Sequence, residues 1–251
     1  YIQNIKITST GGSVLEVPSG AAGKKFVFEN CSLRQIISNT YTDAIEVKSG
    51  TVSFFNCNLH YEQTGTGGGT HRMINITGAS ITQLKLSSIS MEVAIVSDDV
   101  VGITESDNII ELGLNKTSLT ITREGVVTGE TIGVLLNGSY DSQRNSGSRI
   151  TITNDGSGGI ASAVKTSGNT SVLTSISTIY KVTGFTTNNS FNIAATDHIH
   201  SDFDYIEAAD YNTGAGDLYA IHAHNNGDFH VARDISLERN IEVGGTLALA
   251  T

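Results

Sequence analysis

Two histidine pairs near the C-terminus are the first residues whose type and spacing suggest chemistry. His198 and His200 form one pair, and His222 and His224 form the other, each with a single residue between them. Residues two apart on a β-strand share a face, so each pair can direct two imidazoles toward one point. Around a threefold axis, two imidazoles from each of three chains would supply six nitrogens, which suit an octahedral divalent metal such as iron or nickel. The alternative is that these are surface or interface histidines.

Pairs of carboxylates are the second group of interest, because a glycosidase uses one as acid and another as base or nucleophile. The candidates are Asp98 with Asp99, Glu105 with Asp107, and Asp202 with Asp204. Unrelated surface loops contain many such pairs, so none is selected as catalytic. The chain has no Trp to serve as a sugar platform, and the tyrosines that could substitute are Tyr41, Tyr61, Tyr140 and Tyr180. We therefore expect no enzyme, with a polysaccharide lyase or glycosidase as the runner-up.

Composition restricts the elements that can position these residues. The chain combines 27 Gly and one Pro with short β-branched runs punctuated by Gly and Asn, a pattern that indicates an almost entirely β protein. A formal charge of −10 with no basic run argues against a nucleic-acid partner. The apolar stretches are far shorter than the roughly 20 residues that cross a bilayer, so we expect no membrane insertion.

Apolar residues recur every six positions in the last part of the chain. The two recurring series are Phe229, Ile235, Ile241 and Leu247, and Val231, Leu237, Val243 and Leu249. Each hexad reads as a minimal strand followed by a corner, as in a β-prism. Four hexads would make little more than one turn of a single-chain prism, which is too little to bury a core alone. We therefore expect three copies of the chain to form a trimeric stem, with these eight residues as its trimerisation core.

A longer repeat precedes this tail. Residues 26–33 (FVFENCSL) return as residues 52–59 (VSFFNCNL), and degraded copies follow at 86–91 and 114–119. Strand-only units that recur with periods of roughly 26 to 38 residues predict a parallel β-helix, a solenoid of stacked rungs. Cys31 would then lie over Cys57, and Asn30 over Asn56. The cysteines could form a disulfide or a metal pair, but a buried thiol ladder is the favoured interpretation.

The predicted fold is therefore all-β, with a parallel β-helix body followed by an intertwined trimeric β-prism or β-helix stem. We expect β-helix rungs over 1–125, an irregular continuation of the body over 126–195, and a neck with the hexad stem over 196–251. The sequence starts at Tyr1 and stops within a repeat, which favours a fragment or a processed product.

The rungs with Asn-Cys bends, followed by a stem such as residues 241–249, resemble the trimeric tail fibres and tailspikes of bacteriophages and related virion fibres. The two histidine pairs look like the axial metal sites of some phage fibres and spikes. The resemblance implies an extracellular structural virion protein, a homotrimer that joins other tail or baseplate proteins and attaches to a host-surface glycan or protein. The alternatives are a polysaccharide-degrading tailspike enzyme and a cellular adhesin.

Overall fold

The computed structural model describes most of the chain up to residue 193 and separate strands after it. The described residues are 1–38, 43–65, 69–95, 99–105, 111–137, 142–156, 158–167, 172–185, 187–193, 198–202, 205–209, 218–223, 228–231, 236–237, 240–243 and 247–249. Beyond Asn192 the description covers the backbone. No helix in these ranges is long and apolar enough to cross a membrane.

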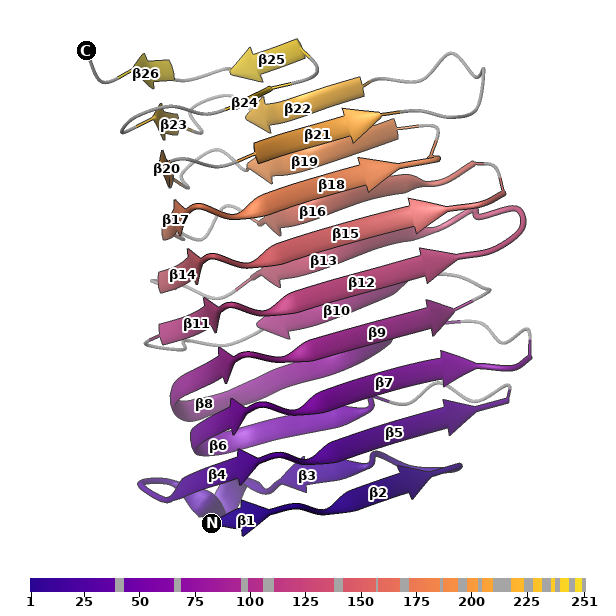
Figure 1. Ribbon diagram of the computed structural model, residues 1–251, viewed down its shortest axis with the longest axis vertical. Helices are drawn as coiled ribbons and strands as arrows, with labels where there is room; N and C mark the ends of the chain where they lie inside the picture. The colour runs from indigo at the N-terminus through magenta and orange to yellow at the C-terminus, as the bar shows by residue number, and fades with distance from the viewer. Residues whose placement is uncertain are drawn as a thin grey trace.

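The chain coils into a parallel β-solenoid, as predicted, and its strands form three walls (Figure 1). One wall, here the third wall, is a nine-stranded sheet in which each strand pairs in parallel with the strands one turn before and after it. Its strands are β2 (Lys6–Ser9), β5 (Ser32–Ile37), β7 (Asn58–Gln63), β9 (Ser90–Ile95), β12 (Ser118–Arg123), β15 (Arg149–Asn154), β18 (Ile179–Thr183), β21 (Tyr205–Ala209) and β24 (Ser236–Leu237).

The other two walls belong to a 17-stranded sheet and are joined by two long strands, β6 (Ile45–Phe55) and β8 (His71–Ser87), that run through both. The first wall also contains β3 (Leu15–Val17), β10 (Val100–Glu105), β13 (Glu130–Leu136), β16 (Ile160–Thr166), β19 (Thr187–Ile193), β22 (Leu218–Ala223) and β25 (Asn240–Val243). The second wall also contains β1 (Ile2–Gln3), β4 (Lys25–Glu29), β11 (Glu111–Asn115), β14 (Ser142–Ser146), β17 (Val172–Ile176), β20 (His198–Asp202), β23 (Asp228–Val231) and β26 (Leu247–Leu249). A 3-10 helix spans Ser19–Ala21.

The corner between the second and third walls explains the Asn-Cys repeat. Asn30 and Asn56 adopt φ angles of 54° and 50°, in the left-handed region that Asn tolerates better than most residues. This reversal turns the next residue inward, and Cys31 and Cys57 are both buried with free thiols. The Cys31 N–H donates to the Cys57 sulfur at 3.4 Å. The predicted stacked thiol ladder is confirmed. Asn30 and Asn56, which directly precede the two cysteines, are exposed.

Like residues stack on like residues throughout the core. One column of the third wall contains Leu33, Leu59, Met91, Leu119, Ile150 and Tyr180, each in register with the next and almost fully buried. In the second wall, the rings of Phe28 and Phe54 stack with centroids 4.9 Å apart. Each such side chain contributes roughly 1.5–3 kcal/mol by leaving water, so the column rather than any one strand stabilises the coil.

The hexad tail continues this coil within the same chain. Phe229 in β23 pairs with Leu247 in β26, so three hexads complete one turn. Phe229 also pairs with Ile199, which pairs with the buried Leu173 of an earlier turn. The strands of the hexads therefore pair with preceding turns of the same chain, and the trimeric stem stays a prediction. Ile235 lies outside the described residues.

Strand pairing also runs through residues 126–195 without leaving the three walls. β13 pairs with β16 and β16 with β19 in the first wall, while β15 pairs with β18 in the third. The strands of this segment pair as regularly as those before it, so its irregular sequence lies in the loops between them.

Candidate functional site

The histidine pairs lie on two different walls. His198 and His200 belong to β20 of the second wall, and His222 belongs to β22 of the first. His224 lies outside the described residues. The predicted trimerisation residues, Ile235 apart, lie on four strands: Phe229 and Val231 on β23, Leu237 on β24, Ile241 and Val243 on β25, and Leu247 and Leu249 on β26.

The candidate carboxylates do not converge in the described part of the chain. Asp99 acts structurally, because its Oδ1 accepts the N–H of Glu130 at 2.7 Å. Glu105 ends β10 and Asp202 ends β20, while their partners Asp107 and Asp204, like Asp98, are outside the described residues.

Two of the candidate tyrosines, Tyr61 and Tyr180, cannot serve as sugar platforms, because both are fully buried. The Tyr61 hydroxyl lies 3.3 Å from His71 Nδ1, and the Tyr180 hydroxyl accepts a hydrogen bond from Asn145 at 2.7 Å. Tyr41 and Tyr140 lie outside the described residues.

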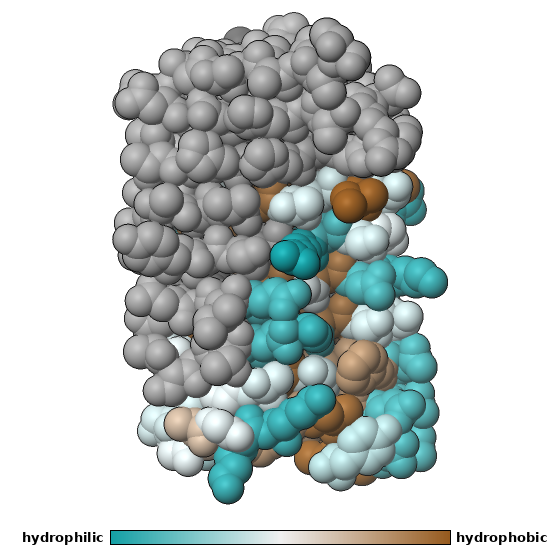
Figure 2. All heavy atoms as spheres, turned by 90° about the vertical axis from the view of Figure 1, so that its left-hand side faces the viewer, coloured by the Kyte–Doolittle hydropathy of each residue, from teal (hydrophilic) through white to brown (hydrophobic). Residues whose placement is uncertain are grey.

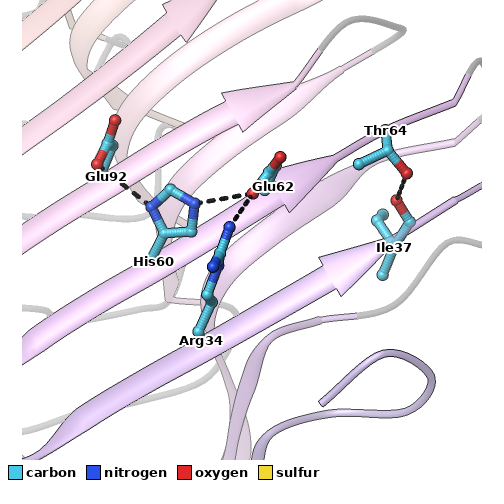
Figure 3. Close-up of polar contacts among 6 residues, drawn as sticks. All are labelled: Arg34, Ile37, His60, Glu62, Thr64 and Glu92. Carbon is cyan, nitrogen blue, oxygen red and sulfur yellow. Dashed lines mark hydrogen bonds and ion pairs between the residues drawn. The ribbon is translucent and has the colours of Figure 1, made fainter. Parts of the chain in front are cut away.

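A charged network that sequence reasoning missed lies on the outer face of the third wall (Figure 3). Arg34 of β5, His60 of β7 and Glu92 of β9 stack in register, and Glu62 lies two residues after His60 on the same face. His60 Nδ1 lies 3.2 Å from Glu92 Oε2, and its Nε2 lies 3.2 Å from Glu62 Oε2. Arg34 Nη2 donates to the same Glu62 oxygen at 2.7 Å. We call these four residues the His60 network.

The contacts of the His60 network bear on the protonation of Glu62. The Arg34 guanidinium, and after it the His60 ring, lowers the pKa of Glu62 below its usual range. Glu62 is therefore held as a carboxylate within hydrogen-bonding reach of one His60 ring nitrogen, while the other ring nitrogen faces Glu92.

A polar groove of about 340 Å³ borders this network, and Thr122 and Glu124 add to its lining. A carboxylate and an imidazole in one groove can exchange protons with a bound polar ligand. The network does not suit a metal, because the two ring nitrogens of His60 face different carboxylates. Among the residues whose side chains the structure describes, none of which lies beyond Asn192, no group of three or more His, Cys, Asp or Glu side chains converges as a metal site would require.

A second groove, here called the Gly113 groove, lies on the outer face of the second wall and has a volume of about 260 Å³. Gly113 pairs with Lys85 on one neighbouring strand and with Arg144 on the other. Because glycine has no side chain, a gap separates the side chains of the two basic residues. Phe55, 37% exposed, lies at one end of the groove. Figure 2 looks onto this wall, where hydrophilic side chains flank a central line of apolar ones.

The Gly113 groove is locally cationic in an acidic protein. Lys85 Nζ lies 3.9 Å from Glu111, a distant and partly exposed ion pair. Arg144 is exposed and has no hydrogen bond or ion pair with any residue that the structure describes. One cation is therefore weakly neutralised and the other is available for an anionic ligand.

One signal in the sequence could have found part of the His60 network. Arg34 and His60 occupy the same position in the two clearest copies of the repeat, 26 residues apart, so the repeat alone predicts that they stack. Glu92 follows His60 after a longer turn, and only the structure gives its register. Comparisons with protein-family profiles, with curated proteins and with solved structures find no match. Function is therefore argued from these two grooves.

Proposed function

We propose that this chain is a segment of a homotrimeric bacteriophage tail fibre or tailspike that attaches the virion to a host-surface glycan. The solenoid fold is compatible with a rigid projecting element, because parallel ladders run from β1 to β26. Polar outer faces and a net charge of −10 suit a fibre displayed in many soluble copies. Other tail or baseplate proteins would be its partners on the particle.

The observation that carries the attachment proposal is the Gly113 groove. Lys85 and Arg144 are two strands apart, about 9.6 Å at the usual strand spacing, which leaves room for a sugar ring over Gly113. The exposed ring of Phe55 offers an apolar surface, while the two cations can bind an acidic group of the sugar. An acidic oligosaccharide therefore fits the groove better than a neutral one.

Filling the groove tests this proposal. A Cβ added at Gly113 would meet only Lys85 Cγ, at 3.8 Å, so Gly113→Val should fold normally. We expect Gly113→Val and Arg144→Gln each to weaken binding of acidic host oligosaccharides at least about tenfold in a glycan-binding assay. The matched control Arg149→Gln removes another exposed cation, on the third wall, and should bind as the wild type does. Equal binding by all three variants would reject the groove.

The oligomeric state is tested separately. Sedimentation equilibrium should give three times the 26.5 kDa mass of one chain. Because the hexads already pair within one chain, the trimer part of the proposal rests on the fibre resemblance. A monomeric species that still binds glycans would overturn the trimer and favour the cellular adhesin.

A polysaccharide-degrading enzyme is the second candidate, favoured by one observation. Glu62, held as a carboxylate, and the His60 ring border the same groove, as a pair of acid–base groups for glycan cleavage would. Incubation with host polysaccharide should then shorten its chains, and His60→Gln and Glu62→Gln should abolish the shortening. Intact polysaccharide after incubation with the wild type would exclude the enzyme.

A further inference from the structure

The strand register at the base of the tail brings together four residues of metal-binding type. β20 and β23 are hydrogen-bonded neighbours in the second wall. Within this pair, His198 is in register with Asp228, and His200 is in register with His230. The sequence segments His-Ile-His and Asp-Phe-His are thus aligned position for position. We call these four residues the β20–β23 array.

The backbone places the four residues close enough to share one ion. Paired residues on neighbouring strands lie about 4.8 Å apart, and residues two apart on one strand share a face about 6.6–7 Å from each other. His198, His200, Asp228 and His230 therefore occupy the corners of one small rectangle. Three imidazoles and one carboxylate match the nitrogen and oxygen donors that zinc takes in tetrahedral sites.

The register positions next to the array that the structure describes carry no cation to repel a metal. Val172 and Thr174 are in register on the preceding turn, and Ala248 pairs with His230 on the following one. Along β20, Asp202 follows His200 by two residues and shares its face, which places a second carboxylate beside the array. Between the ligand positions, Ile199 and Phe229 continue the column of the buried Leu173. Strand pairing therefore sets the spacing of the ligand positions before any ion binds.

We propose that His198, His200, Asp228 and His230 form a binding site for a divalent transition metal, zinc in particular, within a single chain. This site differs from one on a threefold axis, because it needs neither His222 nor His224 nor a second chain. It requires His230, which the sequence pattern alone places beside an apolar hexad residue. The proposal stands apart from glycan attachment, since either can fail without the other.

Metal stoichiometry and two groups of variants test the site. The full chain, treated with chelator and dialysed, is titrated with Zn²⁺ by calorimetry, and with Co²⁺ as a spectroscopic probe of coordination geometry. We expect one ion per chain and an intense tetrahedral Co²⁺ spectrum. His230→Gln and Asp228→Asn should weaken Zn²⁺ binding, the former by roughly 100-fold or more, since loss of a ligand exceeds loss of an outer partner. His222→Gln is the matched control and should leave the affinity unchanged.

Several results would overturn the site. These are one ion per three chains, an octahedral Co²⁺ spectrum, unchanged affinity in His230→Gln, or loss of binding in His222→Gln. Circular dichroism of each variant verifies the fold. If His230→Gln does not fold, His198→Gln replaces it, because the array predicts the same loss and the His222 control still applies.

Discussion

Two histidine clusters on different walls of this solenoid have opposite surroundings. On the third wall, His60 lies in a column between Arg34 and Glu92, and each of its ring nitrogens contacts a different carboxylate. On the second wall, His200 lies in a column between Thr174 and His230, with no charged neighbour of opposite sign in that column. In the first arrangement, both ring nitrogens already face carboxylates of the same chain. In the second, the register positions of the histidines are available for the proposed metal ion. In a solenoid, the residues in register one turn before and after a histidine therefore determine which groups its ring can contact.

Zinc should separate the two clusters most clearly. At a free Zn²⁺ concentration of 100 times the Kd, binding to the folded chain adds about 2.7 kcal/mol to its stability. We expect thermal unfolding to shift upward on addition of Zn²⁺ in the wild type and in His60→Gln, but not in His200→Gln. If the Zn²⁺-induced shift disappeared in His60→Gln and persisted in His200→Gln, zinc would bind at His60 and not at the β20–β23 array.

Removal of His60 should have a smaller effect. Without the ring, Glu62 and Glu92 lose the side chain that lies between them, and exposed contacts of this kind are worth up to about 1 kcal/mol. Urea unfolding of His60→Gln, with Arg149→Gln as the control, measures the loss. A His60→Gln variant that is as stable as the wild type would show that these contacts contribute nothing.

The Arg34 ion pair should give the smallest effect. Arg34 lowers the pKa of Glu62 from its ordinary 4.5, so the carboxylate stabilises the fold above that pH. This contribution is lost as pH falls through the lowered pKa of the folded state. Because both side chains are partly exposed, we expect less than about 1 kcal/mol. Arg34→Gln should flatten the acid limb of the stability profile relative to Arg149→Gln, and an unchanged limb would contradict the assignment.

The sequence predicted the features that repeat. The Phe-any-Asn-Cys-any-Leu motif predicted stacked rungs and buried thiols, since one corner conformation at Asn30 and Asn56 requires the same residues each time. The hexads predicted a minimal strand each, and β23, β25 and β26 have that length. Their strand partners were not predictable, because a period of six describes one strand with its corner and does not specify which strand of the preceding turn lies next to it.

The candidate sites were beyond the sequence for a related reason. Glu92 reaches His60 only because the intervening turn has a particular length, and Asp228 is in register with His198 for the same reason. Gly113 is one of 27 glycines, and only its place between Lys85 and Arg144 makes it the floor of a groove. A loop between two walls can gain or lose residues without disturbing the strands. The number of residues in one turn of the solenoid therefore cannot be predicted from local sequence patterns.

The sequence by itself thus determined the solenoid, its Asn-Cys corner and the apolar columns, because alternation and repeat period act locally. Only the tertiary structure decided which polar residues meet across turns. Neighbouring strands lie about 4.8 Å apart, and the pairing of each one is fixed by the core columns beneath it. That pairing places His60 between two carboxylates, and His200 beside His230.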